Sequence, residues 1–475
     1  MALTKARNRM ITGAQVNVKD FGATGDGTTD DTVAIQAAID SIDKSDDYIT
    51  GGVVYFPSAR YKISAPLLIS GGGAENLASV TLQGEGIHNT IIDVASNFVG
   101  DRAISVLNST YSSFKDFQVL GNNVSSYGIV FEAGSEIYVE RVFSQNHSIA
   151  AFFVKRCFMM TMNQCRTKGG VTGYDFGGGY NTSLSINNCY ALNTTAGGQG
   201  FNILDVSYSN FTSCGADSTG LYGYKISNTA GVSFVSCGAE ESIRAAFYIQ
   251  ASSTLDTDSV ITHTRCTLDN CFSKGADDIA SVGYGSIYTR QFNLSLIDVE
   301  VNRFYEFDVD GGISVNCEGA LSNHVVRLNN CRFTGAIRGN AAVVNQIDVV
   351  RSEAVSITTA NTPVLNLASV FGTTLNYSGI LHVVATNAES DAPTPMNLTA
   401  YVLLVTKSTA GSSVVQIAAN GLTTGGSATQ PSFTWTIDET NNQLEATPIS
   451  ATSGTFFFNI GQVGALNITQ IGDIA

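Results

Sequence analysis

The sequence has few charged side chains and no long hydrophobic run, and each absence excludes a class of protein. Charged residues make up 14% of the 475 residues, which argues against a disordered or coiled-coil chain. No apolar run approaches the roughly eighteen residues of a membrane span, so we expect a soluble protein without membrane insertion. The 25 basic residues against 40 acidic ones argue against nucleic acid as a partner. The net charge of −15 also disfavours long-range attraction of an anionic ligand, although a local basic pocket could still bind one.

Patterns that bind metals or nucleotides are also missing. The five histidines are scattered without metal-ligand spacing, so we expect no metal site. The glycine-rich stretches at 71–73 and 177–179 lack the lysine of a phosphate-binding loop, so nucleotide binding is not expected. We therefore expect a protein that works without a cofactor.

The cysteines are not arranged as disulfide partners would be. There are nine of them, an odd number, and we find no N-terminal signal peptide that would imply an oxidising compartment. Four of them recur at nearly equal intervals along the chain: Cys165, Cys189, Cys214 and Cys237. This spacing favours free, buried thiols stacked as a ladder within a repeat, with disulfides as the alternative.

One phrase of the sequence occurs twice in close succession. Phe211-Thr-Ser-Cys-Gly-Ala-Asp217 returns as Phe234-Val-Ser-Cys-Gly-Ala-Glu240, and Phe201, Tyr224 and Phe247 recur at the same interval. Short apolar runs rich in Val, Ile, Phe and Tyr, broken by turn residues, indicate strands. The region between Ser105 and Arg338 has no long window with helical spacing. We therefore predict an all-β protein whose main part is a right-handed parallel β-helix, with about three short strands in each coil.

The segment from Val16 to Asp40 predicts how the β-helix begins. A short strand turns through three glycines into the one clear helix, which Thr28 or Thr29 can cap, with Asp30 and Asp31 in its first turn. A lone amphipathic helix suits the role of a lid over the open end of the β-helix. Its predicted apolar face consists of Val33, Ile35, Ala37, Ala38 and Ile39.

The same segment resembles a known superfamily. The run from Val18 to Gln36 and the following Gly52-Val-Val-Tyr-Phe-Pro57 are similar to the opening of pectate-lyase-like β-helix proteins, among them bacteriophage tailspikes and capsule or O-antigen depolymerases. The motif is specific for the fold and not for the reaction. The resemblance implies a homotrimer in the virion tail that cleaves a bacterial surface polysaccharide. It also implies attachment to other phage tail proteins through the N-terminus, and a chain made in the host cytoplasm.

We expect five segments along the chain. Residues 1–15 form an anchoring peptide, 16–64 the capping strand, helix and first coil, 65–340 the parallel β-helix, 341–390 its end and a connector, and 391–475 a C-terminal sandwich. The last boundary follows the Asp391-Ala-Pro-Thr-Pro395 break, after which longer alternating strands indicate an antiparallel sandwich of jelly-roll type. Trimerisation is its favoured role, with carbohydrate binding through Trp435 and other aromatics as the alternative.

The repeated phrase also suggests where chemistry takes place. Asp217 and Glu240 occupy the same position in the two copies, so stacked coils would bring the two carboxyl groups about 4.8 Å apart at the backbone. Two carboxyl groups are what glycoside hydrolysis commonly needs, one as acid and one as base or nucleophile. Mutual repulsion would keep one of them protonated. We therefore predict an endo-glycosidase; the alternative for the pair is a structural role at turn amides.

Several neighbouring residues extend this hypothesis. Glu241 replaces Glu240 if the turn points the other way, and Asp269, three residues after Cys266, is a third member of the stack unless Cys271 sets the register. Arg244, Tyr222 and Tyr248 are predicted sugar contacts. Two rival functions stay open: a lyase acting on a uronic-acid polymer, and a receptor-binding spike without enzymatic activity.

Overall fold

The computed structural model describes most of the chain, with gaps. The described residues are 15–42, 51–70, 79–251, 261–274, 284–292, 295–307, 313–318, 324–331, 336–339, 346–349, 351–357, 362–366, 377–387, 397–408, 411–423, 433–440, 443–449 and 454–466. The predicted anchoring peptide therefore lies outside them, apart from Gln15. The chain forms two compact units: residues 1–266 with 275–277, and residues 267–274 with 278–475.

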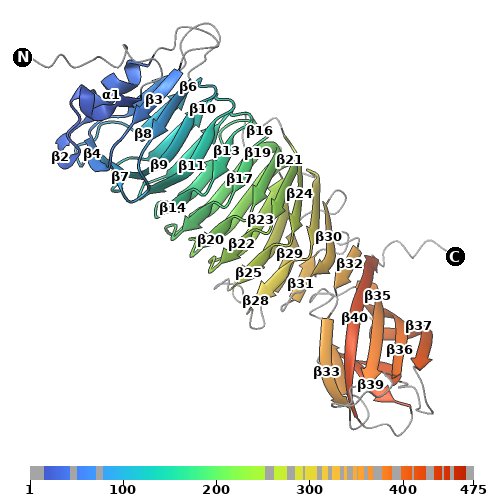
Figure 1. The fold of residues 1–475 in the computed structure, drawn as a ribbon. Coiled ribbons are helices and arrows are strands. Elements are labelled where there is room, and N and C mark those ends of the chain that lie inside the picture. Colours follow the sequence, from blue (N-terminus) through green and yellow to red (C-terminus); the bar gives the residue numbers. More distant parts are fainter. Residues whose placement is uncertain are drawn as a thin grey trace, which may run out of the picture. The chain divides into compact units, whose positions relative to one another are not determined.

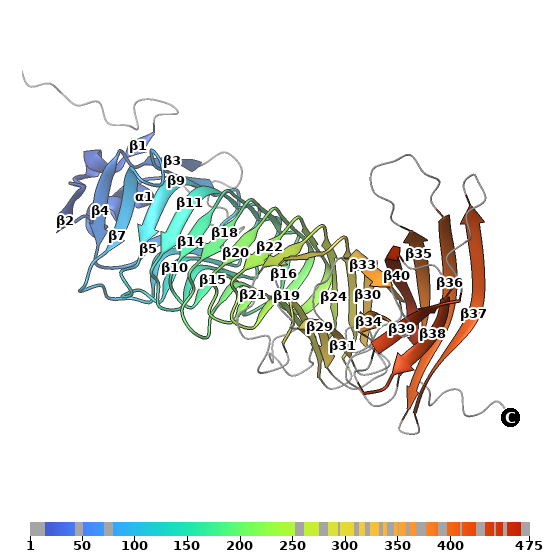
Figure 2. The ribbon, with the colours of Figure 1, turned by 90° about the horizontal axis from the view of Figure 1, so that it is seen from below.

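The first unit is a parallel β-helix, as predicted (Figure 1). Strands of successive coils pair in parallel with matching register, for example Phe211 with Phe234 and Asp217 with Glu240. Figure 2 shows these strands side by side in a second view.

The strands of the first unit follow one another closely along the chain. They are β1 (Val16–Asn17), β2 (Asp26–Asp30), β3 (Gly51–Tyr55), β4 (Ala59–Ile63), β5 (Leu67–Ser70), β6 (Ser79–Gln83), β7 (Thr90–Val94), β8 (Arg102–Leu107), β9 (Ser113–Leu120), β10 (Tyr127–Glu132), β11 (Tyr138–Gln145), β12 (Ala150–Lys155), β13 (Thr161–Asn163), β14 (Arg166–Lys168), β15 (Thr172–Phe176), β16 (Asn181–Thr182), β17 (Ser185–Asn187), β18 (Tyr190–Leu192), β19 (Gln199–Thr212), β20 (Gly215–Asp217), β21 (Tyr222–Val235), β22 (Gly238–Glu240) and β23 (Ala245–Ala251), with β24 (Thr264–Asp269) at the unit boundary.

An aromatic stack fills the interior of the first unit. The rings of Phe152, Tyr174, Phe201, Tyr224 and Phe247 lie on one another with centroids 4.7–5.3 Å apart and interplanar angles of 7° or less. All five side chains are fully buried. The regular recurrence of the last three in the sequence therefore marks a continuous interior column, in which each ring buries the face of the ring before it.

The cysteine ladder is confirmed. All nine cysteines are free and buried, so the disulfide alternative is wrong. The residue before each ladder cysteine has a positive φ: Gln164 (54°), Asn188 (51°), Ser213 (52°) and Ser236 (53°). A single left-handed residue turns the chain at this corner and directs the following Cβ inward, and short polar side chains tolerate that conformation best.

The capping helix lies at the N-terminal end of the first unit, as expected (Figure 1), but it begins later than predicted. Helix α1 spans Thr32–Asp40, preceded by the 3-10 helix η2 (Val18–Phe21). Thr28 and Thr29 belong to strand β2 and are not the cap; Asp31 holds the cap position, but its carboxylate accepts the Thr24 and Gly25 amides instead. Two members of the predicted apolar face are exposed, Ala37 and Val33, whereas Ile35, Ala38 and Ile39 are buried.

The second unit contains further parallel strands and two antiparallel sheets. Strands β33, β40, β35, β36 and β37 form one sheet, and β34, β39 and β38 the other. Its elements are β25 (Phe272–Lys274), β26 (Ile287–Gln291), β27 (Ile297–Asn302), β28 (Tyr305–Phe307), β29 (Ile313–Glu318), β30 (His324–Cys331), β31 (Ala336–Gly339), β32 (Gln346–Val349), β33 (Arg351–Ile357), β34 (Thr362–Asn366), β35 (Tyr377–Asn387), β36 (Asn397–Ser408), β37 (Gly411–Thr423), β38 (Phe433–Asp438), β39 (Gln443–Pro448) and β40 (Gly454–Leu466).

The antiparallel part begins earlier than residue 391. Strand β33 pairs with β40 from Arg351 onward, and β35 pairs with β36 across the predicted break. The Pro-containing segment that suggested a boundary therefore lies between two neighbouring strands of one sheet, and most of the predicted connector is sheet. Among the described residues no helix is long and apolar enough to cross a membrane.

Candidate functional site

One outer face of the first unit carries the repeated acidic position. We call it the acidic face, and it consists of strands β18, β20 and β22. Leu192 on β18 is the register partner of Asp217 on β20, which in turn is the partner of Glu240 on β22. Side chains alternate along a strand, and the preceding residues Ala216 and Ala239 point into the core. Asp217 and Glu240 are therefore held on the outer surface of adjacent coils, half-buried, as the sequence predicts.

A tyrosine that was not predicted from the sequence completes this face. The Tyr190 ring is 39% exposed and lies over Gly215, where an added Cβ would come within 2.4 Å of the ring. Its hydroxyl donates to Asp217 Oδ2 at 3.3 Å. Burial, with the nearby Asp217 and Glu240, raises the pKa of Tyr190 to about 12, so the phenol stays a hydrogen-bond donor. The feature of the sequence that could have indicated Tyr190 is the glycine in each copy of the repeated phrase. A glycine there leaves room for an aromatic ring from the preceding coil.

A serine links the acidic groups. Ser218 Oγ contacts Asp217 Oδ1 at 2.8 Å and Glu241 Oε2 at 3.0 Å. Glu241 follows the strand with φ 49° and is exposed, so it lies at the turn beside the pair and does not replace Glu240 in the register. The carboxyl of Glu240 accepts no hydrogen bond from any described residue, which leaves it open to solvent and ligand.

Asp269 does not occupy the position that the sequence assigned to it. Asn270 has φ 53° and precedes Cys271, so Cys271, and not Cys266, is the corner cysteine. Asp269 therefore lies two residues before the corner cysteine, whereas Asp217 and Glu240 lie three residues after theirs. Its carboxylate forms a bidentate ion pair with Arg303 within the second unit. The expectation of Asp269 as a third member of the acidic stack is therefore wrong in register.

The predicted sugar contacts lie apart from the acidic strands. Tyr222 begins β21 and Tyr248 lies in β23; the two rings stack with centroids 4.5 Å apart and are 8% and 6% exposed. Arg244 is half-buried in the turn that follows β22. The two tyrosines therefore expose little surface to a ligand, whereas Tyr190 is 39% exposed.

A second outer face carries a row of mixed polar groups. We call it the lysine face: Phe153, Asp175, Asn202, Lys225 and Tyr248, which are register partners on β12, β15, β19, β21 and β23. The residues on either side of Asp175, Asn202 and Lys225 are fully buried, so these three point outward. The row was not predicted from the sequence, because its members share no residue type.

The charges of the lysine face are poorly hydrated. Burial raises the pKa of Asp175 to about 6, against the lowering effects of the Asn202 hydrogen bond and of Lys225. Burial likewise lowers the pKa of Lys225, partly offset by Asp175. Perturbed groups of opposite sign on one surface are a feature of functional sites.

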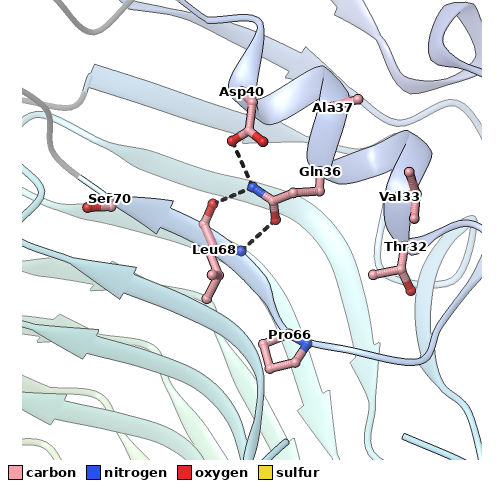
Figure 3. A pocket seen from close by; sticks show the side chains of 8 residues that line it. All are labelled: Thr32, Val33, Gln36, Ala37, Asp40, Pro66, Leu68 and Ser70. Carbon is pink, nitrogen blue, oxygen red and sulfur yellow. Dashed lines mark hydrogen bonds between the residues drawn. The ribbon is translucent and has the colours of Figure 1, made fainter. Parts of the chain in front are cut away.

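The pocket beside the capping helix is a weaker candidate (Figure 3). It has a volume of about 540 Å³ and is lined by Thr32, Val33, Gln36, Ala37, Asp40, Pro66, Leu68 and Ser70. The Gln36 amide pairs with both backbone groups of Leu68 and with Asp40. These polar groups attach α1 to strand β5 and are not available for catalysis.

Within the described part of the chain no cluster of His, Cys, Asp or Glu could hold a metal ion.

The comparisons with known proteins agree with this fold. Residues 15–229 match the family described as rhamnogalacturonase A/epimerase, pectate lyase-like. The match lies within the parallel β-helix of the first unit, so the resemblance of the opening motif to pectate-lyase-like proteins is confirmed. Alginate lyase 7 of Azotobacter vinelandii is 44% identical over 84 residues, which are 18% of this chain and 9% of the relative. The chain thus spans about a tenth of the length of that relative.

Two solved structures share the fold over most of both chains. The gp42 tailspike of Acinetobacter phage vb_AbaP_AS12 has a TM-score of 0.52 and 12% identity, covering 89% of this chain and 84% of that one. The enzymatically active domain of tailspike protein 2 of bacteriophage CBA120 has a TM-score of 0.51 and 11% identity, covering 96% and 81%. At this identity the likeness shows a common fold.

Proposed function

We propose that the protein is a phage tailspike depolymerase that cleaves glycosidic bonds of a bacterial surface polysaccharide on the acidic face. The observation that carries this proposal is the exposed Tyr190 ring beside two carboxyl groups held in register on adjacent coils. An aromatic face packs on a sugar ring, and a carboxyl pair supplies acid and base or nucleophile. The tailspike names of two neighbours of the same fold support the phage setting.

The hydrogen bonds suggest different roles for the two carboxyls. Asp217 accepts from Tyr190 and contacts Ser218, which fixes its orientation and suits a base or nucleophile. Glu240 lacks such bonds among the described residues and suits the acid that protonates the leaving oxygen. The glycosidic bond breaks as the Glu240 proton passes to that oxygen. Asp217 either attacks the anomeric carbon or takes a proton from the attacking water.

A second candidate function has its own support. The local similarity to alginate lyase 7 favours β-elimination of a uronic-acid polymer, in which a base removes a proton and the product carries a double bond. Ultraviolet absorbance of that double bond separates the two reactions. Hydrolysis yields reducing ends without it.

The test uses the full chain and the surface polysaccharide of the host bacterium. Size-exclusion chromatography should show a fall in polymer length, and Asp217→Asn or Glu240→Gln should lower kcat on the order of 10² to 10⁴. Glu136→Gln, an exposed carboxyl outside both faces, is the matched control and should keep full activity. Full activity of both folded acidic-face variants would refute the assignment of the carboxyl pair, and an unchanged polymer would favour a spike that only binds.

A further inference from the structure

The Lys225 ammonium forms no ion pair within the described part of the chain. It points outward from β21 between the buried side chains of Tyr224 and Ile226, yet it is half-buried by its surroundings. Among the described residues it makes no hydrogen bond and no ion pair. Partly removing an ammonium from water without a hydrogen-bond partner is unfavourable, and burial accordingly lowers the pKa of Lys225.

The nearest opposite charge in the row does not satisfy it. Asp175 lies two coils away, with Asn202 between them, and its Oδ1 accepts the Asn202 amide at 2.7 Å. Two coil steps separate the backbones by about 9.6 Å, and no hydrogen bond or ion pair joins the two side chains in the described part of the chain. The Asp175 carboxyl also keeps a pKa of about 6 despite Lys225, as expected of a weakly coupled pair.

A glycine flanks this row. Gly177 lies beside Asp175, and a Cβ there would come within 2.8 Å of Asp175 Oδ1 and 3.4 Å of Asn202 Nδ2. An aromatic residue lies at each end of the row: Phe153, whose ring centroid is 5.3 Å from that of Tyr127, and Tyr248, whose ring stacks on Tyr222. The row therefore has polar groups in its middle and an aromatic residue at each end.

We propose that the lysine face binds an acidic sugar residue of the polysaccharide, with Lys225 pairing with its carboxylate and Asn202 and Asp175 contacting its hydroxyl groups. The row offers an ammonium, an amide and a carboxyl at about 4.8 Å intervals, a spacing suited to groups around one or two sugar rings. In a chain of net charge −15 this cation acts by local contact and not by long-range attraction. The inference rests on the proposed function and deepens it, because it names the charge class of the substrate.

The test measures binding of defined probes to the full chain by isothermal titration calorimetry. The probes are hexasaccharides of mannuronate, guluronate, galacturonate and glucuronate, each beside its carboxyl-reduced, neutral form. At least one uronate probe should bind, its neutral form should bind at least ten-fold more weakly, and Lys225→Met should weaken the uronate by a similar factor. Lys225→Arg should restore part of the affinity because it keeps the charge.

A matched control and a second readout keep the outcomes distinct. Lys115→Met removes a lysine from β9, outside the lysine face, and should leave the affinity unchanged. Equal binding of uronate and neutral probes, or no binding of any probe, overturns the inference. Loss of an oligomer in Lys225→Met also overturns it, because the counter-ion would then be a second copy of the chain. Cleavage of host polysaccharide without uronate binding would leave the proposed function standing while the inference fails.

Discussion

Replacing Asp175 by asparagine should make the protein more stable at neutral pH and leave it almost unchanged in acid. The folded protein raises the pKa of this carboxyl from 3.8 to about 6 by burying it. A raised pKa means that the folded state holds its proton more tightly than the unfolded chain does. The contribution of this group to stability is therefore present in acid and is lost as the pH rises through 6.

The size of the effect follows from the shift. A rise from 3.8 to about 6 corresponds to about 3 kcal/mol once the carboxyl is ionised in both states. At pH 4 the same linkage leaves only about 0.6 kcal/mol. Asparagine has the same shape, its oxygen can accept the Asn202 amide, and it does not ionise. The gain of Asp175→Asn over wild type should thus grow by about 2.4 kcal/mol between pH 4 and pH 7.5.

The assay is urea unfolding of wild type and variant at both pH values and at one protein concentration, followed by tyrosine fluorescence. Taking the difference between the two proteins cancels the other titrating groups. Asp20→Asn, an exposed residue of η2, is the control and should show no such widening. A constant difference across the pH range would refute the conclusion that Asp175 is protonated below pH 6 in the folded protein.

Three further predictions follow from the interior and from the acidic face. Gly215→Ala should displace the Tyr190 ring, because the added Cβ would lie 2.4 Å from it. The KM for the polysaccharide should rise several-fold while the circular dichroism spectrum stays unchanged. An unchanged KM would show that Tyr190 does not contact the substrate. Phe201→Ala should cost about 3–5 kcal/mol of unfolding free energy, since it interrupts the aromatic stack, and a loss below about 1 kcal/mol in urea unfolding would contradict the stack's role. None of the nine thiols should react with Ellman's reagent in the native protein, because every cysteine is buried and burial raises the pKa of thiols such as Cys317. All nine should react after denaturation. Rapid labelling of the native protein would show that the ladder opens.

The repeat made much of the fold predictable. Equal spacing of Cys214 and Cys237 and of Phe211 and Phe234 revealed the coil length, and register followed because a strand slipped by one residue would turn its whole apolar set outward. The acidic pair was predictable for the same reason. The predicted start of the helix was wrong because the Asp31 carboxylate accepts the Thr24 and Gly25 amides. The rule for helix caps considers only contacts to the first turn of the helix, so it does not predict these bonds to the preceding loop.

Residues that act through neighbouring coils were not predictable from the sequence. Tyr190 lies one coil before Gly215, its register partner, and its exposure depends on that glycine. Asp175 and Lys225 lie on strands two coils apart, and Asn202 on the coil between them is the register partner of both. Nothing in the sequence marks these three residues as members of one row. Asp269 was misplaced because Cys266 and Cys271 both fit the cysteine position of the repeat, and only the left-handed Asn270 decides between them.

The corner before each ladder cysteine has a consequence for how such a chain can change its length. Removing the whole segment from Phe211 to Ser233 would join Asn210 to Phe234, whose register partner is Phe211, so every later side chain would meet an equivalent neighbour. Glu240 would then follow Leu192 in the row, and the acidic pair would be reduced to one carboxyl. Removing a single residue would instead turn the following cysteine outward. Whole coils are thus the units of insertion and deletion here, and gain or loss of one coil changes the surface chemistry while the interior columns remain continuous.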